Sequence, residues 1–343
     1  MPFEMSEVER AADAMITGGA VAVTVDVRAG GTHVTIARGL RDLDSRLPAV
    51  SDSPTRIASV SKMMVSAVVL KLVEQRKFML DAPAVESLPE QAEVLGSATI
   101  RQLLDHTGGV PNPLRQLLAG KSAPEQIALA QKPYTDEDWL ALTRAMPRSE
   151  GFDYSNTNYL LLAMIAQRVT DTALPELLRQ YVFAPVGMTS TSVPTEDRLS
   201  PESLMPYVFD GDNPVPAPVQ SPSYWGPGGW VVSTPADLSA FARALFSGQL
   251  FTESLLTEMM TPGPSGSYGL GIFARADVCG KPEPIWGNRG NGLGAKSYLF
   301  ASPDGNRVVA LTWTGADIDI PNDRLNTEVN DLLNAGLAAT CPH

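Results

Sequence analysis

The sequence predicts an α/β protein in which both ends of the chain build one antiparallel sheet, flanked by N- and C-terminal helices, with a large, mainly helical region inserted between them. Valines alternate strictly near the N-terminus, helical signals dominate the middle of the chain, and short β-like runs return near the C-terminus. We therefore expect a sheet-containing region of residues 1–58 plus 251–343 and a mainly helical region of residues 59–250. The active site is expected in the cleft between them.

The first elements are a helix and a strand pair. Residues 4–17 have the apolar spacing of a short amphipathic helix. Apolar residues then alternate with other residues on both sides of the turn at Gly30-Gly31, which predicts two paired strands. The alternating positions are Val21, Val23, Val25, Val27, Val34 and Ile36.

The later elements follow a long helical stretch. Helical signals run from Ser59 to about Leu250 and are interrupted by proline- and glycine-rich loops such as residues 210–229. Three short β-like runs come next, at residues 268–273, 298–300 and 308–313. The spacing of apolar residues then predicts a closing helix that contains Leu325, Val329 and Leu332.

Composition restricts the partners of the protein. The chain has 343 residues, 44% of them hydrophobic, and a formal net charge of −12, so an extended nucleic-acid or anionic-membrane surface is not expected. The N-terminus carries acids where a secretory signal has basic residues, and no apolar run reaches the roughly 18 residues of a membrane span. We therefore expect a cytoplasmic protein with a small-molecule substrate, and the oligomeric state stays open.

Cysteines and histidines do not suggest a metal or cofactor. Cys279 and Cys341 are far apart in a chain without an evident export signal, so both are expected to be free thiols. The histidines His33, His106 and His343 are too scattered for a zinc signature. We expect no metal site and no cofactor.

A polar cluster precedes a long apolar helix at residues 56–73. Ser59 and Lys62 are three positions apart, which makes them neighbours on a helix. A lysine that is partly neutral through burial can take the proton of a serine hydroxyl, and free N–H groups at a helix start favour an oxyanion. The alternative is a lysine whose stem lies on apolar surface while its tip reaches water. By itself the pair is a weak signal.

A second cluster stands before the apolar helix of residues 160–169. Tyr154 and Asn156 are two positions apart, so their side chains can point the same way in an extended segment. Polar residues in front of a helix are also common as N-caps. In the functional interpretation Tyr154 acts as base for Ser59 and then as acid for the leaving group, and Asn156 holds a substrate amide and the lysine tip.

These motifs resemble those of the serine β-lactamase and penicillin-binding protein superfamily, in its class C and DD-peptidase branch. Segments along nearly the whole chain resemble that branch in the same order, at residues 80–83, 100–109, 183–188, 228–238 and 268–271. The resemblance implies the fold described above, and it makes His106 a structural loop residue. The pattern around residues 232–248 looks most similar to D-amino-acid amidases, D-aminopeptidases and related esterases.

The third motif of the superfamily, Lys-Thr-Gly or His-x-Gly, corresponds here to Asn288-Arg289-Gly290. The resemblance implies that Gly290 allows close approach of the substrate backbone, and that the N–H groups of Asn291 and Ser59 form the oxyanion hole. Asn288 lacks the charge that helps bind a substrate carboxylate in the family. Arg289 could compensate, although strand alternation points its side chain away from the face that Asn288 uses; alternatively, it forms a surface salt bridge.

The predicted function is a serine hydrolase that forms an acyl-enzyme on a small amide, peptide or ester. Tyr224 and Trp225 stand in the loop before Gly228 and are expected to line a hydrophobic acyl site. One alternative is an acyltransferase on a small-molecule acyl donor. Another is a non-catalytic binding domain on the same fold, which the neutral Asn288 favours.

Overall fold

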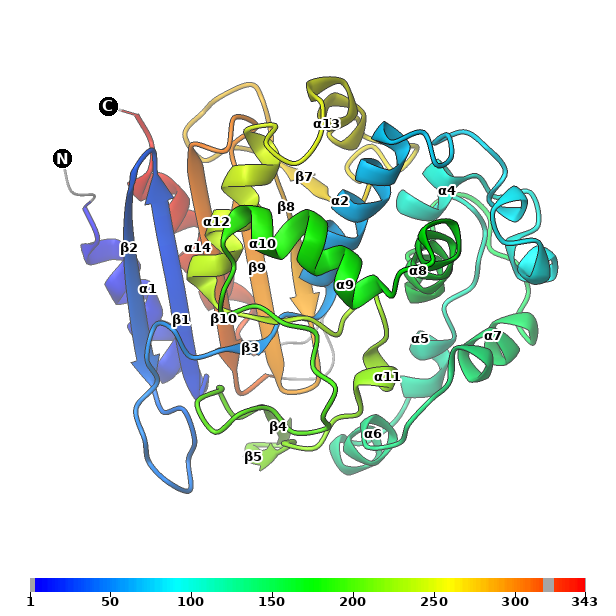
Figure 1. The fold of residues 1–343 in the computed structure, drawn as a ribbon. Coiled ribbons are helices and arrows are strands. Elements are labelled where there is room, and N and C mark those ends of the chain that lie inside the picture. The colour runs from blue at the N-terminus through cyan, green and yellow to red at the C-terminus, as the bar shows by residue number, and fades with distance from the viewer. Residues whose placement is uncertain (1–3, 317–323, 343) are drawn as a thin grey trace.

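The structure is a computed structural model that describes residues 4–316 and 324–342. Six strands form one antiparallel sheet in the order β2-β1-β10-β9-β8-β7. Their bounds are Ala22–Ala29 for β1, Thr32–Gly39 for β2, Phe273–Arg275 for β7, Ile285–Asn291 for β8, Ala295–Ala301 for β9 and Arg307–Thr314 for β10. Strands from the two ends of the chain therefore meet in one sheet, as predicted, with β1 beside β10 (Figure 1).

Strand alternation gives the sheet two buried faces. Val25 lies opposite Leu311 in the β1–β10 register, and both pack against the terminal helices α1 (Ser6–Thr17) and α14 (Asn326–Ala339). Residues of the opposite parity, such as Trp286 and Leu299, pack against the helical part of the chain. The flanking terminal helices of the predicted fold are confirmed (Figure 1).

The middle of the chain is mainly helical. Its two long buried helices are α2 (Ser61–Glu74) and α8 (Asn156–Thr170), which contact each other (Figure 1). The shorter helices are α3 (Ala92–Leu95), α4 (Ile100–Leu104), α5 (Pro113–Leu118), α6 (Ala123–Ala130), α7 (Asp136–Arg144), α9 (Leu174–Leu178), α10 (Ala184–Val186), α11 (Pro222–Trp225), α12 (Pro235–Phe246) and α13 (Glu253–Met259). Helix α12 contacts β1, β9 and β10, so part of the middle segment covers a face of the sheet.

Two small strand pairs connect these parts. Strand β3 (Thr55–Arg56) pairs with β6 (Val232–Ser233), and β4 (Tyr207–Asp210) pairs with β5 (Asn213–Pro216). The first pair ties the segment before α2 to the segment before α12. In the part of the chain that the structure describes, no helix combines the length and apolarity that crossing a membrane requires.

The β-like run predicted at residues 268–273 is wrong except at its last residue. Phe273 begins β7, whereas Tyr268 lies in a tight bend and meets Phe273 through an isolated bridge. The bend includes a hydrogen bond from the Gly269 N–H to the Ile272 carbonyl, and Gly271 has a φ of 87°. Its apolar residues are buried because the bend packs into the core. The apolar run at residues 268–273 therefore indicated a buried segment and not a strand.

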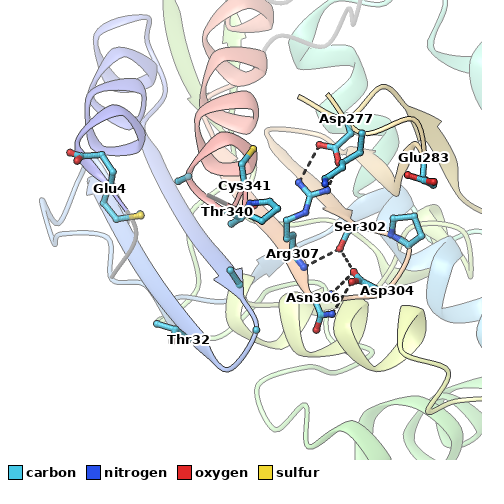
Figure 2. Close-up of a pocket in the computed structure, with 17 residues that line it drawn as sticks. Glu4, Thr32, Asp277, Glu283, Ser302, Asp304, Asn306, Arg307, Thr340 and Cys341 are labelled. Carbon is cyan, nitrogen blue, oxygen red and sulfur yellow. Dashed lines mark hydrogen bonds and ion pairs between the residues drawn. The ribbon is translucent and has the colours of Figure 1, made fainter. Parts of the chain in front are cut away.

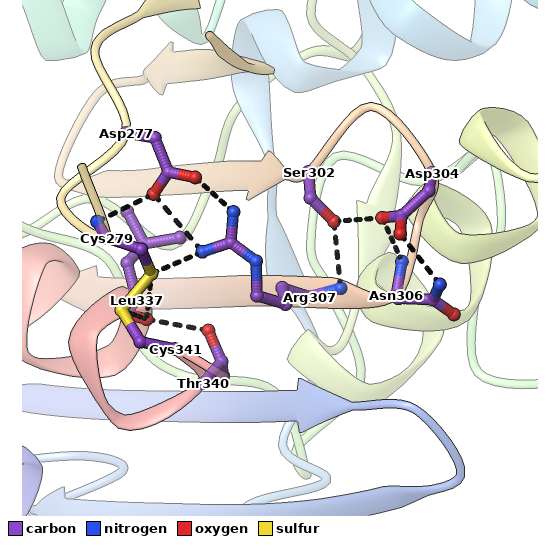
Figure 3. Close-up of polar contacts among 9 residues, drawn as sticks. All are labelled: Asp277, Cys279, Ser302, Asp304, Asn306, Arg307, Leu337, Thr340 and Cys341. Atoms are coloured by element: carbon purple, nitrogen blue, oxygen red, sulfur yellow. Dashed lines mark hydrogen bonds and ion pairs between the residues drawn. A yellow bond between two sulfur atoms is a disulfide. The ribbon is translucent and has the colours of Figure 1, made fainter. Parts of the chain in front are cut away.

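The prediction of free thiols is also wrong. Cys279 and Cys341 form a disulfide with a Cα–Cα distance of 5.5 Å (Figure 3). The end of α14 lies against the β7–β8 connection, which brings together two cysteines that are 62 positions apart in the sequence. Arg307 donates from Nη1 to the Cys279 sulfur at 2.6 Å and forms an ion pair with Asp277. Because disulfides persist in oxidising compartments, cysteine usage no longer supports a cytoplasmic location.

Candidate active site

Ser59 lies in a short 3₁₀ turn between β3 and α2, and the chain holds this turn on both sides. The Ile57 N–H donates to the Val231 carbonyl at 3.0 Å, and the Ser297 hydroxyl donates to the Ile57 carbonyl at 2.6 Å. Ala58 has a φ of 45°, a left-handed conformation that L-residues rarely adopt. Such conformations persist where the surrounding structure enforces them, and they concentrate at functional sites.

Lys62 is fully buried, and its amine contacts Ser59. The Nζ–Oγ distance is 3.1 Å, and Nζ also donates to Asn156 Oδ1 at 2.6 Å and to the Gly228 carbonyl at 2.8 Å. Burial lowers the pKa of Lys62 to about 7, although its two carbonyl acceptors also stabilise the ammonium. A neutral amine has two N–H groups for those acceptors and one lone pair that faces the Ser59 hydroxyl.

Tyr154 is the third group at the nucleophile. Tyr154 lies close enough to Ser59 for the serine side chain to lower the pKa of the phenol, and Lys62 Nζ lies 4.9 Å from the centroid of its ring. Burial raises the pKa of Tyr154, and the nearby charge of Arg289 offsets only part of this effect. The phenol therefore stays protonated near neutral pH, which suits a proton donor. The expectation that Tyr154 also takes the Ser59 proton stays a prediction, and the buried Lys62 amine beside Ser59 Oγ is the other candidate acceptor.

Asn156 is the first residue of α8, and it does not act as a helix cap. Its Oδ1 is occupied by Lys62, and the N-cap residue Ser155 donates its hydroxyl to the Pro111 carbonyl at 2.8 Å instead of capping the helix. The N-cap interpretation of this polar cluster is therefore wrong.

His106 supports Tyr154 from behind. Its Nδ1 accepts the Ser155 N–H at 3.2 Å and lies 3.0 Å from Asn158 Nδ2, while its ring lies 4.3 Å from the Tyr154 ring between centroids. Burial lowers the pKa of His106 well below its usual value, so the ring is neutral and Nε2–H faces the Tyr268 hydroxyl at 3.2 Å. The structural role predicted for His106 agrees with this geometry.

The third-motif segment lies on β8, where the strand passes the nucleophile. Asn288 is fully buried, donates from Nδ2 to the Gly271 carbonyl at 2.9 Å, and accepts the Arg289 N–H at 2.8 Å. Its amide therefore joins β8 to the buried bend behind the site, and the expectation that Asn288 contacts substrate is not supported.

Arg289 points to the opposite face from Asn288, as alternation predicts, but this face opens into the site. Its guanidinium lies 5.4 Å from the Phe273 ring centroid and acts on Tyr154 through its charge. Among residues 4–316 and 324–342, no carboxylate forms a salt bridge with it. The described residues therefore give no support to the alternative of a surface salt bridge.

Gly290 is required for a different reason from the one predicted. A Cβ at this position would lie 2.1 Å from the Ile57 carbonyl oxygen and 2.3 Å from Ser297 Oγ. The turn that carries Ser59 therefore approaches Gly290 closely, and the approach of a substrate backbone there stays a prediction. Asn291 lines the same cavity as Ser59, as expected for a partner in an oxyanion hole.

Two hollows open beside the nucleophile. The wide cavity has a volume of about 280 Å³, and the narrow slot beyond Asn156 has a volume of about 30 Å³. The wide cavity is lined by residues that include Ser59, Phe152, Tyr154, Phe273, Arg289 and Tyr298. The narrow slot is lined by residues that include Asn112, Asp136, Trp139, Asn156, Tyr224 and Trp225.

The structure therefore brings most of the predicted site residues together and adds others. Tyr224 and Trp225 line the slot as expected, but a space of this size holds a group of about water size rather than a bulky acyl side chain. Sequence reasoning missed Asn112, which precedes α5, and Asp136 and Trp139, which both lie on α7. No short motif joins them, so only the packing of these segments reveals the slot.

A larger hollow of about 1070 Å³ opens near the disulfide (Figure 2). Two of its carboxylates have partners within the hollow: Asp277 pairs with Arg307, and Asp304 accepts from Ser302 and Asn306. No nucleophile and base pair like Ser59 and Lys62 lies among the described residues that line it. The Ser59 site therefore remains the candidate active site.

Comparison with known proteins identifies the family. A family model described as Beta-lactamase matches residues 6–332. The chain belongs to the beta-lactamase family. The superfamily resemblance inferred from its motifs is confirmed, and the chain is a serine hydrolase of that family.

Several members and relatives of the beta-lactamase family are similar along most of the chain. Penicillin-binding protein 4 of Amycolatopsis lactamdurans is 29% identical over 92% of this chain and 86% of its own length. A D-aminopeptidase of Cereibacter sphaeroides is 26% identical over 91% of this chain, but the match spans only 60% of that protein.

Solved structures share the fold at lower identity. A D-stereospecific amidohydrolase from Streptomyces sp. superposes with a TM-score of 0.84 at 24% identity, covering 98% of this chain and 100% of the other. A D-amino acid amidase from Ochrobactrum anthropi SV3, complexed with L-phenylalanine, superposes with a TM-score of 0.83 at 23% identity, covering 97% and 98%. These likenesses confirm the α/β fold of the beta-lactamase family.

Proposed function

We propose that this serine hydrolase cleaves small amides or esters of amino acids, with D-amino-acid amides as the preferred class, through an acyl-enzyme on Ser59. The observation that carries the proposal is the Lys62 amine, which lies 3.1 Å from Ser59 Oγ and is held by two carbonyl acceptors. The names of the similar amidohydrolase, amidase and D-aminopeptidase support the substrate class.

Acylation uses Lys62 as base and Tyr154 as acid. The neutral Lys62 amine takes the Ser59 proton while Oγ attacks the carbonyl carbon, and the N–H groups of Ser59 and Asn291 stabilise the oxyanion. The Tyr154 hydroxyl then gives its proton to the leaving nitrogen or oxygen as the carbonyl–leaving-group bond breaks, and the Lys62 ammonium returns a proton to Tyr154. Water attacks the acyl-enzyme in the same way and releases the acid.

A non-catalytic role loses its one supporting feature. The neutral Asn288 favoured a binding domain, but its amide bonds the Gly271 carbonyl and the neighbouring Arg289 N–H within the protein. Its missing charge therefore does not argue against turnover at Ser59.

Intact-protein mass spectrometry with p-nitrophenyl acetate tests the acyl-enzyme directly. We expect one acetyl adduct, located on Ser59 by peptide mapping, and none on Ser59→Ala. Lys62→Met should slow adduct formation by at least about a hundredfold, since general-base assistance contributes roughly that factor. Equal labelling of the intact protein and Ser59→Ala would contradict the proposal. Product analysis with an added amine then separates hydrolysis from acyl transfer.

A further inference from the structure

The narrow slot beside Asn156 has an unusual balance of hydrogen-bonding groups. Asn112 Nδ2 donates to the Tyr154 carbonyl at 3.2 Å, which fixes the orientation of the amide. Its Oδ1 is buried and has no hydrogen-bond partner, and the residue is only 8% exposed. Buried acceptors without a partner are uncommon in proteins. We therefore expect a hydrogen-bond donor of a bound ligand to lie next to this oxygen.

Asp136 adds a negative charge at the same place. It is the first residue of α7 and lines the slot, although the residue as a whole is solvent-exposed. Partial burial of the carboxyl group raises its pKa, and no positive group of the described chain counteracts that effect. No lysine, arginine or histidine lies among the described residues that line the slot.

Aromatic rings supply the remaining walls. The Trp139 indole donates its N–H to the Ser223 carbonyl at 3.1 Å, and the Trp225 indole donates to Gln220 Oε1 at 2.9 Å. Both N–H groups are therefore used outside the slot. The rings offer the slot carbon surface, and aromatic faces attract cations.

We propose that the narrow slot is a subsite for a primary ammonium group on the acyl part of the substrate, with Asp136 as its specificity-determining residue. An ammonium group has three donors and no acceptor, which matches the free Asn112 oxygen and the Asp136 carboxylate. The slot volume of about 30 Å³ admits a group of this size and excludes an aromatic ring. This inference rests on the proposed function and specifies its substrates as amides or esters with a free amine.

The position of the slot fits an amine close to the scissile carbonyl. Asn156 lines the slot and also bonds Lys62, which contacts Ser59. The slot therefore begins two hydrogen bonds away from the nucleophile. The rest of the substrate would occupy the wide cavity, which contains Tyr154 and is lined by Phe152 and Phe273.

Binding to an inactive variant tests the subsite without requiring turnover. On Ser59→Ala, calorimetry should show D-phenylalaninamide binding at least about tenfold more tightly than its N-acetyl derivative, because acetylation removes the charge-assisted hydrogen bonds. Adding Asp136→Asn should abolish most of this difference. Adding Glu137→Gln removes the same charge from the neighbouring residue, which pairs with Arg144 at 2.5 Å, and should preserve it.

Two further arms complete the experiment. N-acetyl-lysinamide carries its amine at the end of the side chain, so comparing it with D- and L-phenylalaninamide shows whether an α- or a side-chain ammonium occupies the slot. In the active enzyme, Asp136→Asn should lower the ratio of kcat/KM for free and N-acetylated substrates by about tenfold.

The outcomes separate the two proposals. Equal affinity for the free and acetylated amides, or an amine preference that survives Asp136→Asn, overturns the ammonium subsite. Absence of a Ser59 adduct with p-nitrophenyl acetate overturns the acyl-enzyme proposal, and the affinities measured on Ser59→Ala still decide what the slot binds.

Discussion

Burial lowers the pKa of Lys62, which suits the proposed role of its amine as a base. Its amine has a pKa of about 7 because the helix that carries it is buried on nearly all sides. Its neighbours give the amine a defined orientation, since Asn156 Oδ1 and the Gly228 carbonyl take two of its hydrogens. A Cβ at position 228 would lie 3.0 Å from Nζ, so Gly228 leaves the room that this geometry needs.

The acidity of Lys62 predicts the pH dependence of acylation. Only the neutral amine accepts the Ser59 proton, so kcat/KM for an uncharged ester should rise with pH, level off above about 7, and fall about tenfold per pH unit below it. Burial raises the pKa of Tyr154, so ionisation of the phenol should not lower kcat/KM in the neutral pH range. An initial-rate profile from about pH 5 to 9 measures this; a flat profile would contradict the assignment of Lys62.

Arg289 and Lys296 are cationic residues that both line the wide cavity, and Arg289 is the one beside Tyr154. Dipeptide substrates carry a carboxylate on the leaving group, whereas simple amides do not, and a guanidinium near Tyr154 can bind it by charge-assisted hydrogen bonds. We predict that Arg289→Gln lowers the ratio of kcat/KM for a dipeptide to that for the matching amide by about tenfold. Steady-state kinetics on both substrates checks this; Arg275→Gln, outside the cavity, is the control, and an unchanged ratio in Arg289→Gln refutes the role.

The turn before α2 depends on its contact with β8. The Ile57 carbonyl lies so close to Gly290 that any side chain there must displace the turn or the strand. Ser297 Oγ also donates to this carbonyl at 2.6 Å, so the position of Ser59 is set by the sheet and not only by its own helix.

Gly290→Ala should therefore damage catalysis more than folding. We expect kcat to fall by about a hundredfold, since misplacing a nucleophile by about 1 Å has effects of that size. The free energy of unfolding should fall by about 1–3 kcal/mol, as overpacking usually costs. Gly31→Ala is the matched control, because nothing lies within 4 Å of a Cβ there. Wild-type kcat in Gly290→Ala would disprove the positional role of this contact.

The connection between β7 and β8 is held to the C-terminal helix by the disulfide (Figure 3). Both of these parts also contribute to the wide cavity, through Phe273 on β7 and through Asn326 and Val329 on α14. A covalent link at one edge of the sheet therefore stabilises two walls of the site.

Replacing both cysteines, as Cys279→Ala with Cys341→Ala, should lower the free energy of unfolding by about 2–4 kcal/mol, because the crosslink closes a long loop in the unfolded chain. Thermal unfolding of the variant and of the oxidised protein measures the difference, and dithiothreitol should lower the melting temperature of the oxidised protein alone. Val278→Ala serves as a control for the same exposed connection. A melting temperature that does not respond to the reductant would count against the bond.

The arrangement of the sheet was predictable because its signals are local. Alternating valines reveal β1 and its apolar face, and the β-like runs at residues 298–300 and 308–313 lie within β9 and β10. The bend at Tyr268 was not predictable in this way, since a short apolar run has the same pattern in a strand and in any buried segment.

Local spacing also predicted the candidate catalytic residues, whereas the proposed selectivity depends on packing between distant segments. Ser59 and Lys62 are three residues apart, and Tyr154 and Asn156 are two apart, so a single turn or extended segment brings each pair together. The orphaned Asn112 oxygen, the Asp136 carboxylate and the disulfide depend on contacts between segments far apart in the chain. Periodicity along a sequence reports which face of an element is buried, but not which distant element covers it.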